Sequence, residues 1–114
     1  MSYITAIGVA NPTTRIAQPA IADFMVQAMQ LNEDDSRKLK TLFRASGIAY
    51  RHSVLDDYAR LSDFTFYPNN LKHNLPGTKA RGELYQKHAP LLSAQAVHAA
   101  IEQTSLSPSD ITHL

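Results

Sequence analysis

The sequence predicts an α/β protein that is mostly helical and has few short strands. Three observations support this prediction. Residues 3–10 alternate as a strand does, two helical patterns follow between residues 19 and 47, and a longer helical pattern covers residues 80–107. Helical segments that follow and precede strand-like segments are typical of α/β folds.

The first element is the predicted strand at residues 3–10. One of its faces carries Tyr3, Thr5, Ile7 and Val9, and the other carries Ile4, Ala6, Gly8 and Ala10. Both faces are mostly apolar, which predicts a strand that is covered on two sides. The small residues of the second face would let a helix or another strand approach closely.

A helix is predicted from Pro19 to Gln30, with Pro19 suited to its first turn. Its apolar residues recur at helical spacing and form one stripe, which we expect to be buried: Ile21, Phe24, Met25, Ala28 and Met29. Met25 and Met29 are therefore interpreted as core residues.

A second helix is predicted between Asn32 and Gly47. Asn32 suits the N-cap, the three acidic residues that follow it suit the positive end of the helix dipole, and Gly47 provides a stop. Its expected buried stripe consists of Leu39, Leu42 and Phe43.

The middle of the chain is less regular. Residues 48–55 read as a short strand, and residues 56–79 read mostly as a loop with a short helix near Asp57 to Leu61. A loop of this length in a compact domain often covers or lines a site.

The C-terminal residues raise the question of completeness. Ser107 to Asp110 read as one capped helical turn, and Ile111 to Leu114 read as the start of a strand. A lone short strand buries too little surface to be stable. We therefore expect residues 1–114 to be an incomplete portion of a larger domain.

Composition excludes several classes of protein. Lys plus Arg number 11 and Asp plus Glu 10, a net charge of +1 that does not suit a nucleic-acid binder. Cysteine is absent, which rules out disulfides, a thiolate metal site and a cysteine nucleophile within these residues. No apolar run approaches the ~18 residues of a membrane span, and the first ten residues do not read as a signal peptide. The sequence thus predicts a cytoplasmic protein that binds neither nucleic acid nor membrane.

Four blocks give the sequence a family resemblance: "ITAIGVANP", "FRASGIAYRHSVL", "ARGELYQKHAPLLSAQAVHAAI" and "SPSDITHL". Their order and spacing resemble the N-terminal part of type III polyketide synthases, the chalcone-synthase-like acyltransferases. The resemblance implies a thiolase-like fold, a homodimer, and condensation of a coenzyme A-linked starter with malonyl-CoA by a cysteine, a histidine and an asparagine. No tightly bound cofactor is implied.

In that family the three catalytic groups follow the strand that matches "ITHL", so no catalytic residue is predicted here. The chain by itself is therefore expected to be inactive. Two alternatives remain open. The initiating ketoacyl-ACP synthases share a similar Ser-Gly-Ile-x-x-Arg-His block, and a non-enzymatic helical interaction module could bind a partner through the edge at residues 111–114.

The predicted ligand-binding residues are basic and lie on the second helix: Arg37, Lys38, Lys40 and Arg44. In the family this helix carries a Lys-x-x-Arg-x-x-x-Lys pattern that contacts coenzyme A phosphates. A gap-free alignment places Lys38, Thr41 and Ala45 on the pattern. One inserted residue places Arg37, Lys40 and Arg44 there instead, at spacings that share one helix face.

A structural interpretation of these charges competes with the phosphate interpretation. Glu33 with Arg37, and Asp34 with Lys38, are helix pairs of favourable orientation. Arg51 is interpreted as a packed or ion-paired arginine. The five histidines show no metal-ligand spacing, so no metal site is predicted.

Overall fold

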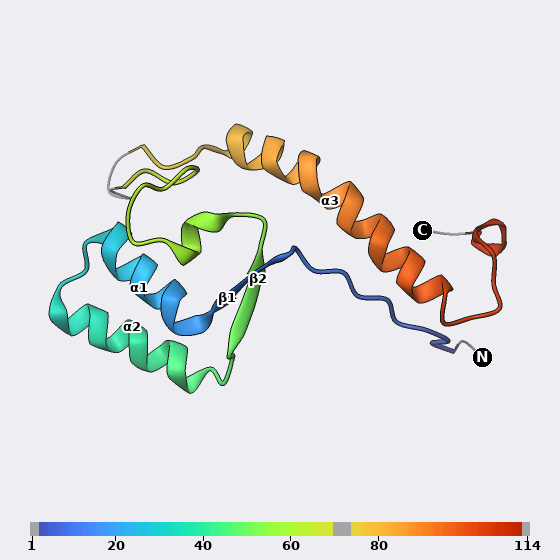
Figure 1. Ribbon diagram of the computed structural model, residues 1–114, viewed down its shortest axis with the longest axis horizontal. Helices are drawn as coiled ribbons and strands as arrows, with labels where there is room; N and C mark the ends of the chain where they lie inside the picture. Colours follow the sequence, from blue (N-terminus) through green and yellow to red (C-terminus); the bar gives the residue numbers. More distant parts are fainter. Residues whose placement is uncertain (1–2, 70–73, 113–114) are drawn as a thin grey trace. The chain divides into compact units, whose positions relative to one another are not determined.

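The computed structural model describes residues 3–69 and 74–112. Figure 1 shows a mostly helical α/β chain with one small sheet, as the sequence predicted. The chain divides into two compact units. Unit 2 is Pro12–Gly82, and unit 1 combines Met1–Asn11 with Glu83–Leu114.

Unit 2 contains both strands of the sheet. Strand β1 (Thr14–Ala17) pairs antiparallel with β2 (Tyr50–Ser53), in a register that joins Thr14 to Ser53 and Ala17 to Tyr50. The predicted strand within residues 48–55 is confirmed as β2. Strand β1 was missed because its four residues carry no strong alternation, and its partner lies far along the sequence.

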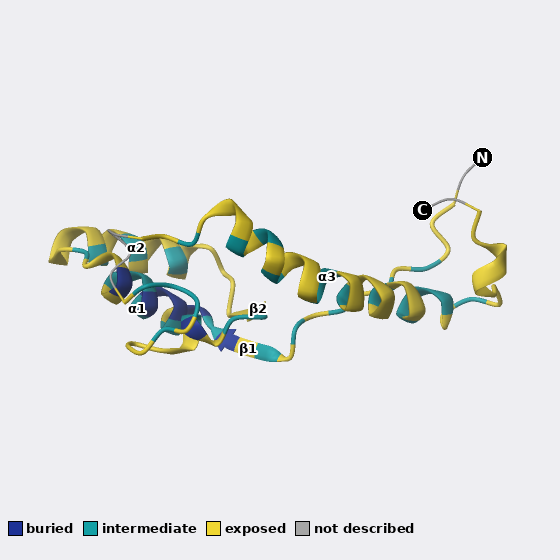
Figure 2. Cartoon of the chain, turned by 90° about the horizontal axis from the view of Figure 1, so that it is seen from above, coloured by how far each residue is buried: buried dark blue, intermediate teal, exposed yellow. Residues whose placement is uncertain are grey.

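Helix α1 (Gln18–Met29) confirms the first predicted helix and supplies most of the core (Figure 2). Pro19 lies in its first turn, where a missing backbone N–H costs nothing. Its buried residues are Gln18, Ile21, Ala22, Phe24 and Ala28. Met25 is half-buried, and the prediction for Met29 is wrong, since 40% of it is exposed in the last turn.

Helix α2 (Glu33–Ala45) confirms the second predicted helix and its cap. The Asn32 side-chain oxygen accepts a hydrogen bond from the Asp35 N–H at 2.9 Å, and Gly47 follows with a φ of 68°. The predicted buried stripe is wrong. None of residues 33–45, all of which the structure describes, is buried, and Leu42 is 67% exposed.

The segment after β2 is irregular, as predicted, and begins with a short 3₁₀ helix, η1 (Asp56–Ala59). The fully buried Asp57 carboxylate organises it. This carboxylate accepts hydrogen bonds from three successive backbone N–H groups and from one hydroxyl: Thr65 N and Oγ1 at 2.8 and 2.7 Å, and Phe66 N and Tyr67 N at 2.8 Å.

Burial raises the pKa of Asp57, but these hydrogen bonds outweigh the effect of burial and lower the pKa below its ordinary value.

Aromatic rings from this segment cover Phe24 of α1. The Phe24 ring centroid lies 5.1 Å from that of Tyr58, 4.8 Å from that of Phe64 and 6.0 Å from that of Tyr67. The hydroxyls of Tyr58 and Tyr67 are 2.9 Å apart. Burial first, and then the contact with Tyr67, raise the pKa of Tyr58. The segment therefore completes the core of unit 2.

Unit 1 contains the extended residues 3–11 and most of helix α3 (Thr78–Ile101). The predicted strand at residues 3–10 is wrong, because these residues pair with no strand in the described part of the chain. The prediction that its face of small residues allows a helix to approach closely is confirmed. A Cβ placed on Gly8 would lie 1.9 Å from the Ala96 carbonyl oxygen, so only glycine lets this segment approach α3 so closely.

The other face of the same segment is exposed, with Ile7 at 70%. Ile4, on the face of the small residues, is also exposed, so the prediction of a segment covered on both faces is wrong. Only the small residues of that face are half-buried: Ala6, Gly8 and Ala10. The Gln103 side-chain amide adds a second contact, because it donates to the Ile7 carbonyl at 3.0 Å and to the Ala99 carbonyl at 2.7 Å.

The end of the described chain is the short 3₁₀ helix η2 (Pro108–Asp110), which confirms the predicted capped turn. The Asp110 carboxylate accepts from the Ser107 N–H at 2.8 Å. Helix α3 stops at Ile101, earlier than predicted, where the Thr104 hydroxyl donates to the Ile101 carbonyl at 2.8 Å. Ile111 and Thr112 do not form the predicted strand, and His113 and Leu114 lie outside the described residues.

Candidate phosphate-binding pocket

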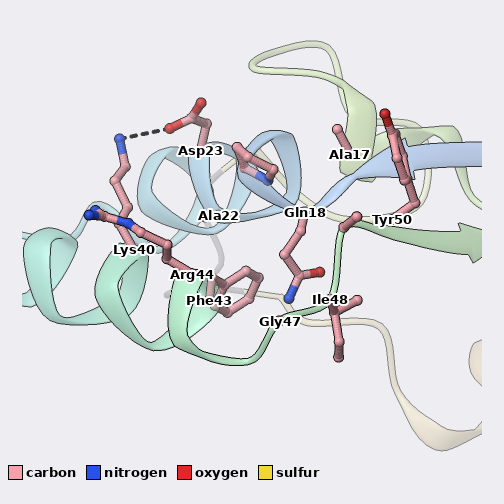
Figure 3. A pocket seen from close by; sticks show the side chains of 12 residues that line it. Ala17, Gln18, Ala22, Asp23, Lys40, Phe43, Arg44, Gly47, Ile48 and Tyr50 are labelled. Atoms are coloured by element: carbon pink, nitrogen blue, oxygen red, sulfur yellow. Dashed lines mark ion pairs between the residues drawn. The ribbon is translucent and has the colours of Figure 1, made fainter.

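Unit 2 contains a pocket of about 700 Å³ beside the start of α1 and the end of α2 (Figure 3). Its lining combines apolar side chains, two cations and one carboxylate: Ala17, Gln18, Pro19, Ala22, Asp23, Lys40, Phe43, Arg44, Gly47, Ile48, Ala49 and Tyr50. The irregular segment after β2, a loop of the length that often covers or lines a site, contributes none of these residues.

The buried Gln18 joins the elements that form the pocket wall. Its backbone N–H donates to the Ala49 carbonyl at 2.9 Å, and its side-chain oxygen accepts from Arg51 Nε at 3.1 Å. Its side-chain nitrogen lies 3.5 Å from the Ser46 hydroxyl, just after α2. Arg51 is exposed and makes no ion pair with any residue that the structure describes, so the predicted packed or ion-paired arginine is wrong, and its side chain makes this hydrogen bond to Gln18 instead.

The structure divides the predicted basic set into two pairs. Lys40 and Arg44 are four residues apart on α2 and both line the pocket. Arg37 and Lys38 do not line it, and both pair with Asp34 at the start of the same helix. The predicted Asp34–Lys38 pair is present, whereas Arg37 contacts Asp34 instead of Glu33.

The positive charge of Lys40 is partly neutralised by Asp23 of α1. Its Nζ lies 2.7 Å from Asp23 Oδ1, the contact drawn as a dashed line in Figure 3. Arg44 makes no ion pair with any residue in the ranges 3–69 and 74–112. The pocket therefore offers one uncompensated guanidinium beside one ammonium that shares its charge with a carboxylate.

Such an arrangement suits an organic phosphate. A guanidinium can bind two phosphate oxygens at once, and a neighbouring ammonium can bind a third as a compact charge. The apolar side chains of Phe43 and Ile48 provide contact area for the uncharged part of a ligand.

Two further features are absent from the residues that the structure describes. These contain no group of three or more metal-ligating side chains. Among them, too, no helix is both long enough and apolar enough to cross a membrane.

Sequence reasoning missed two functional features of the pocket. Asp23 lies on the polar face of α1, and nothing in its local spacing indicates that it meets Lys40 of the next helix. Gln18 precedes Pro19 and looks like an ordinary surface residue before a helix. Both roles depend on contacts between distant segments, which periodicity does not report.

Two of three comparisons with known proteins find a similar protein. No family model matches the sequence. Bisdemethoxycurcumin synthase from Oryza sativa subsp. japonica is 28% identical over 116 residues, which cover 100% of this chain and 28% of that protein. The crystal structure of PKS-I from the brown alga Ectocarpus siliculosus superposes with a TM-score of 0.72 and 22% identity, over 91% of this chain and 28% of that chain.

The fold is therefore part of a thiolase-like α/β fold, as predicted. The chain is similar to type III polyketide synthases, and the predicted resemblance to their N-terminal part is confirmed. It spans little more than a quarter of the length of each of these two relatives, 28% in both cases.

Proposed function

We propose that this chain forms part of the coenzyme A-binding side of a cytoplasmic, homodimeric acyltransferase of the type III polyketide synthase kind. The substrates would be a coenzyme A-linked starter and malonyl-CoA, with no tightly bound cofactor. One observation carries the proposal: Lys40 and Arg44 line the same pocket on α2, in a chain similar to enzymes of this class.

In this proposal Lys40 and Arg44 bind the phosphates of coenzyme A. The pocket lining includes Lys40 and Arg44 but none of the residues that the gap-free alignment places on the pattern, which are Lys38, Thr41 and Ala45. This supports the alignment that places Arg37, Lys40 and Arg44 on the family pattern. Arg37 lies on the same helix face but is held by Asp34, and it would contribute at the edge of the site.

The chain would bind the ligand without transferring the acyl group. Transfer through a covalent thioester requires a thiolate, and the 114 residues contain no cysteine. The contribution of this chain would be positioning, because phosphate contacts remote from the reacting thioester can fix the orientation of the substrate.

Titration of the 114-residue chain with coenzyme A tests the proposal, with the dissociation constant measured by calorimetry. We expect the double variant Lys40→Ala, Arg44→Ala to bind at least tenfold more weakly, because each charge-assisted hydrogen bond contributes roughly 1.5–3 kcal/mol. Lys87→Ala, which removes an exposed charge from α3, should leave the affinity within about twofold.

Lys38→Ala distinguishes the two alignments, since it should have no effect if Lys40 and Arg44 are the binding pair. Unchanged affinity in the double variant, or no binding by the wild-type chain, would contradict the proposal.

A further inference from the structure

We propose that Asp23 is a specificity-determining residue of this pocket. Its carboxylate pairs with Lys40, and an organic diphosphate that binds Lys40 must displace this carboxylate. The inference rests on the proposed function, because it concerns the same two cations. Asp23 belongs to α1 and Lys40 to α2, so their contact bridges the two helices at the pocket wall.

The contact between Asp23 and Lys40 differs from the other ion pairs of α2. Arg37 and Lys38 pair with Asp34 within one helix, at spacings of three and four residues, and all three residues lie outside the pocket lining. In contrast, both partners of the bridging pair line the pocket, so a ligand that fills it meets the carboxylate as well as the ammonium.

The bridging pair is accessible enough to be exchanged. The side chains of Asp23 and Lys40 are each 48% exposed, and half-exposed ion pairs are weakened by water and salt. A phosphate group carries more charge and more acceptor oxygens than a carboxylate. Phosphate can therefore take Lys40 from Asp23, but the displaced carboxylate then lies unpaired near the ligand and reduces its affinity.

This penalty falls unequally on different ligands. A ligand that spans Lys40 and Arg44 must displace Asp23, whereas a single phosphate can bind Arg44 and leave the bridging pair intact. Asp23 thus lowers the affinity for diphosphates selectively, and its removal should relax that restriction.

The opposite role for Asp23 makes an opposite prediction. If Asp23 served mainly to hold the Lys40 side chain in its binding conformation, removal of the carboxylate would weaken the binding of a diphosphate. The direction of the change in affinity therefore decides between the two roles.

The test compares Asp23→Asn with wild type in the full 114-residue chain, using coenzyme A and inorganic phosphate as probes. We expect coenzyme A to bind about two- to fivefold more tightly, the range for one exposed ion pair, and inorganic phosphate to change by less than about 1.5-fold. Asp63→Asn is the matched control. It makes the same charge change at an exposed position outside the pocket, where asparagine tolerates the φ of 57°.

A double-mutant cycle with Lys40→Ala isolates the effect that the Asp23–Lys40 interaction has on the affinity for coenzyme A. Asp23→Asn should no longer tighten coenzyme A binding once Lys40 is removed. The proposal is overturned if Asp23→Asn weakens binding, if it behaves like Asp63→Asn, or if it still tightens binding in the Lys40→Ala background. Asp23→Ala repeats the measurement should the asparagine variant fold poorly.

Failure here is distinguishable from failure of the proposed function. Suppose that the double variant Lys40→Ala, Arg44→Ala abolishes coenzyme A binding while Asp23→Asn has no effect. The assignment of the pocket is then supported, and the proposed role of Asp23 is rejected. If the double variant binds normally, both fall together.

Discussion

The two compact units differ in whether they bury apolar side chains in a core of their own. In unit 2 the side chains of Ile16, Ile21, Phe24 and Ala28 are buried within the unit, and aromatic rings from η1 and from the segment after it cover Phe24. In unit 1 no residue that the structure describes is buried, and apolar side chains are exposed on both of its parts: Tyr3, Ile4, Ile7, Val9, Tyr85 and Leu91.

This difference indicates where the stability of the chain resides. Unit 2 has its own core, whereas unit 1 buries none of its described residues, and its contacts include a close backbone approach at Gly8 and the hydrogen bonds of Gln103. Substitutions in unit 2 should therefore affect global unfolding, and substitutions in unit 1 should act locally.

The largest expected effect is that of Phe24→Ala. Phe24 is 2% exposed and its ring contacts three other aromatic rings, so its loss should lower the free energy of unfolding by roughly 3–5 kcal/mol. Urea denaturation followed by circular dichroism measures the change. Leu91→Ala is the control in unit 1, where a 64% exposed side chain predicts a change below about 0.5 kcal/mol. Similar losses in both variants would remove the distinction between the units.

Asp57→Asn should have an intermediate effect, a loss of roughly 1–3 kcal/mol in the free energy of unfolding. An asparagine oxygen can still accept from Thr65, but its NH₂ group would face the N–H groups of Phe66 and Tyr67, which are donors too. The unfolding transition in urea at pH 7 gives the value, and a change below about 0.5 kcal/mol would contradict this role.

The same carboxylate predicts a pH dependence. The pKa of Asp57 in the folded state is lowered from its ordinary 3.8, so its contribution to stability is present above about pH 4 and is lost as the pH falls through the folded pKa. The Asn variant should lack that part of the acid transition. Asp110, whose pKa Ser107 lowers in the exposed η2 turn, is the counterpart in unit 1, and Asp110→Asn should leave the global acid transition unchanged.

Gly8→Ala should have the smallest effect on global unfolding, below about 1 kcal/mol, together with a clear local effect. The added Cβ would lie 1.9 Å from the Ala96 carbonyl oxygen, so the segment must move away from α3. The nuclear Overhauser effect between the Hα of residue 8 and the Ala100 methyl group should then disappear. Gly82→Ala, where nothing lies within 4 Å of the new Cβ, should retain it.

The helices could be predicted from the sequence because their signals are local. Pro19, Asn32 and Gly47 mark helix boundaries through their own backbone and side-chain chemistry, and the structure places each where expected. Burial could not be predicted as well. The apolar stripe of α2 looks like that of α1, yet Leu42 is exposed, because periodicity shows which face is apolar and not whether another element covers it.

The candidate site shows the same limit. Helical spacing correctly placed Lys40 and Arg44 together on one face, and it left open whether Arg37 or Lys38 accompanies them. The partner of Lys40 depends on how α1 and α2 cross, a contact between helices that no single-helix pattern contains. The anchoring role of Asp57 could not be predicted for a related reason. In the sequence it looks like a solvent-exposed carboxylate in a polar loop, and its backbone donors lie eight or more residues further along the chain.

The way in which Asp57 anchors the segment after η1 has a consequence for sequence variation. Two of its four hydrogen bonds come from the main-chain amides of Phe66 and Tyr67, which every amino acid except proline possesses. A randomised library at position 66 should therefore exclude proline on backbone grounds while keeping the anchor intact with many other side chains. The anchor therefore requires the acidic residue at position 57, whereas position 66 can vary widely in sequence.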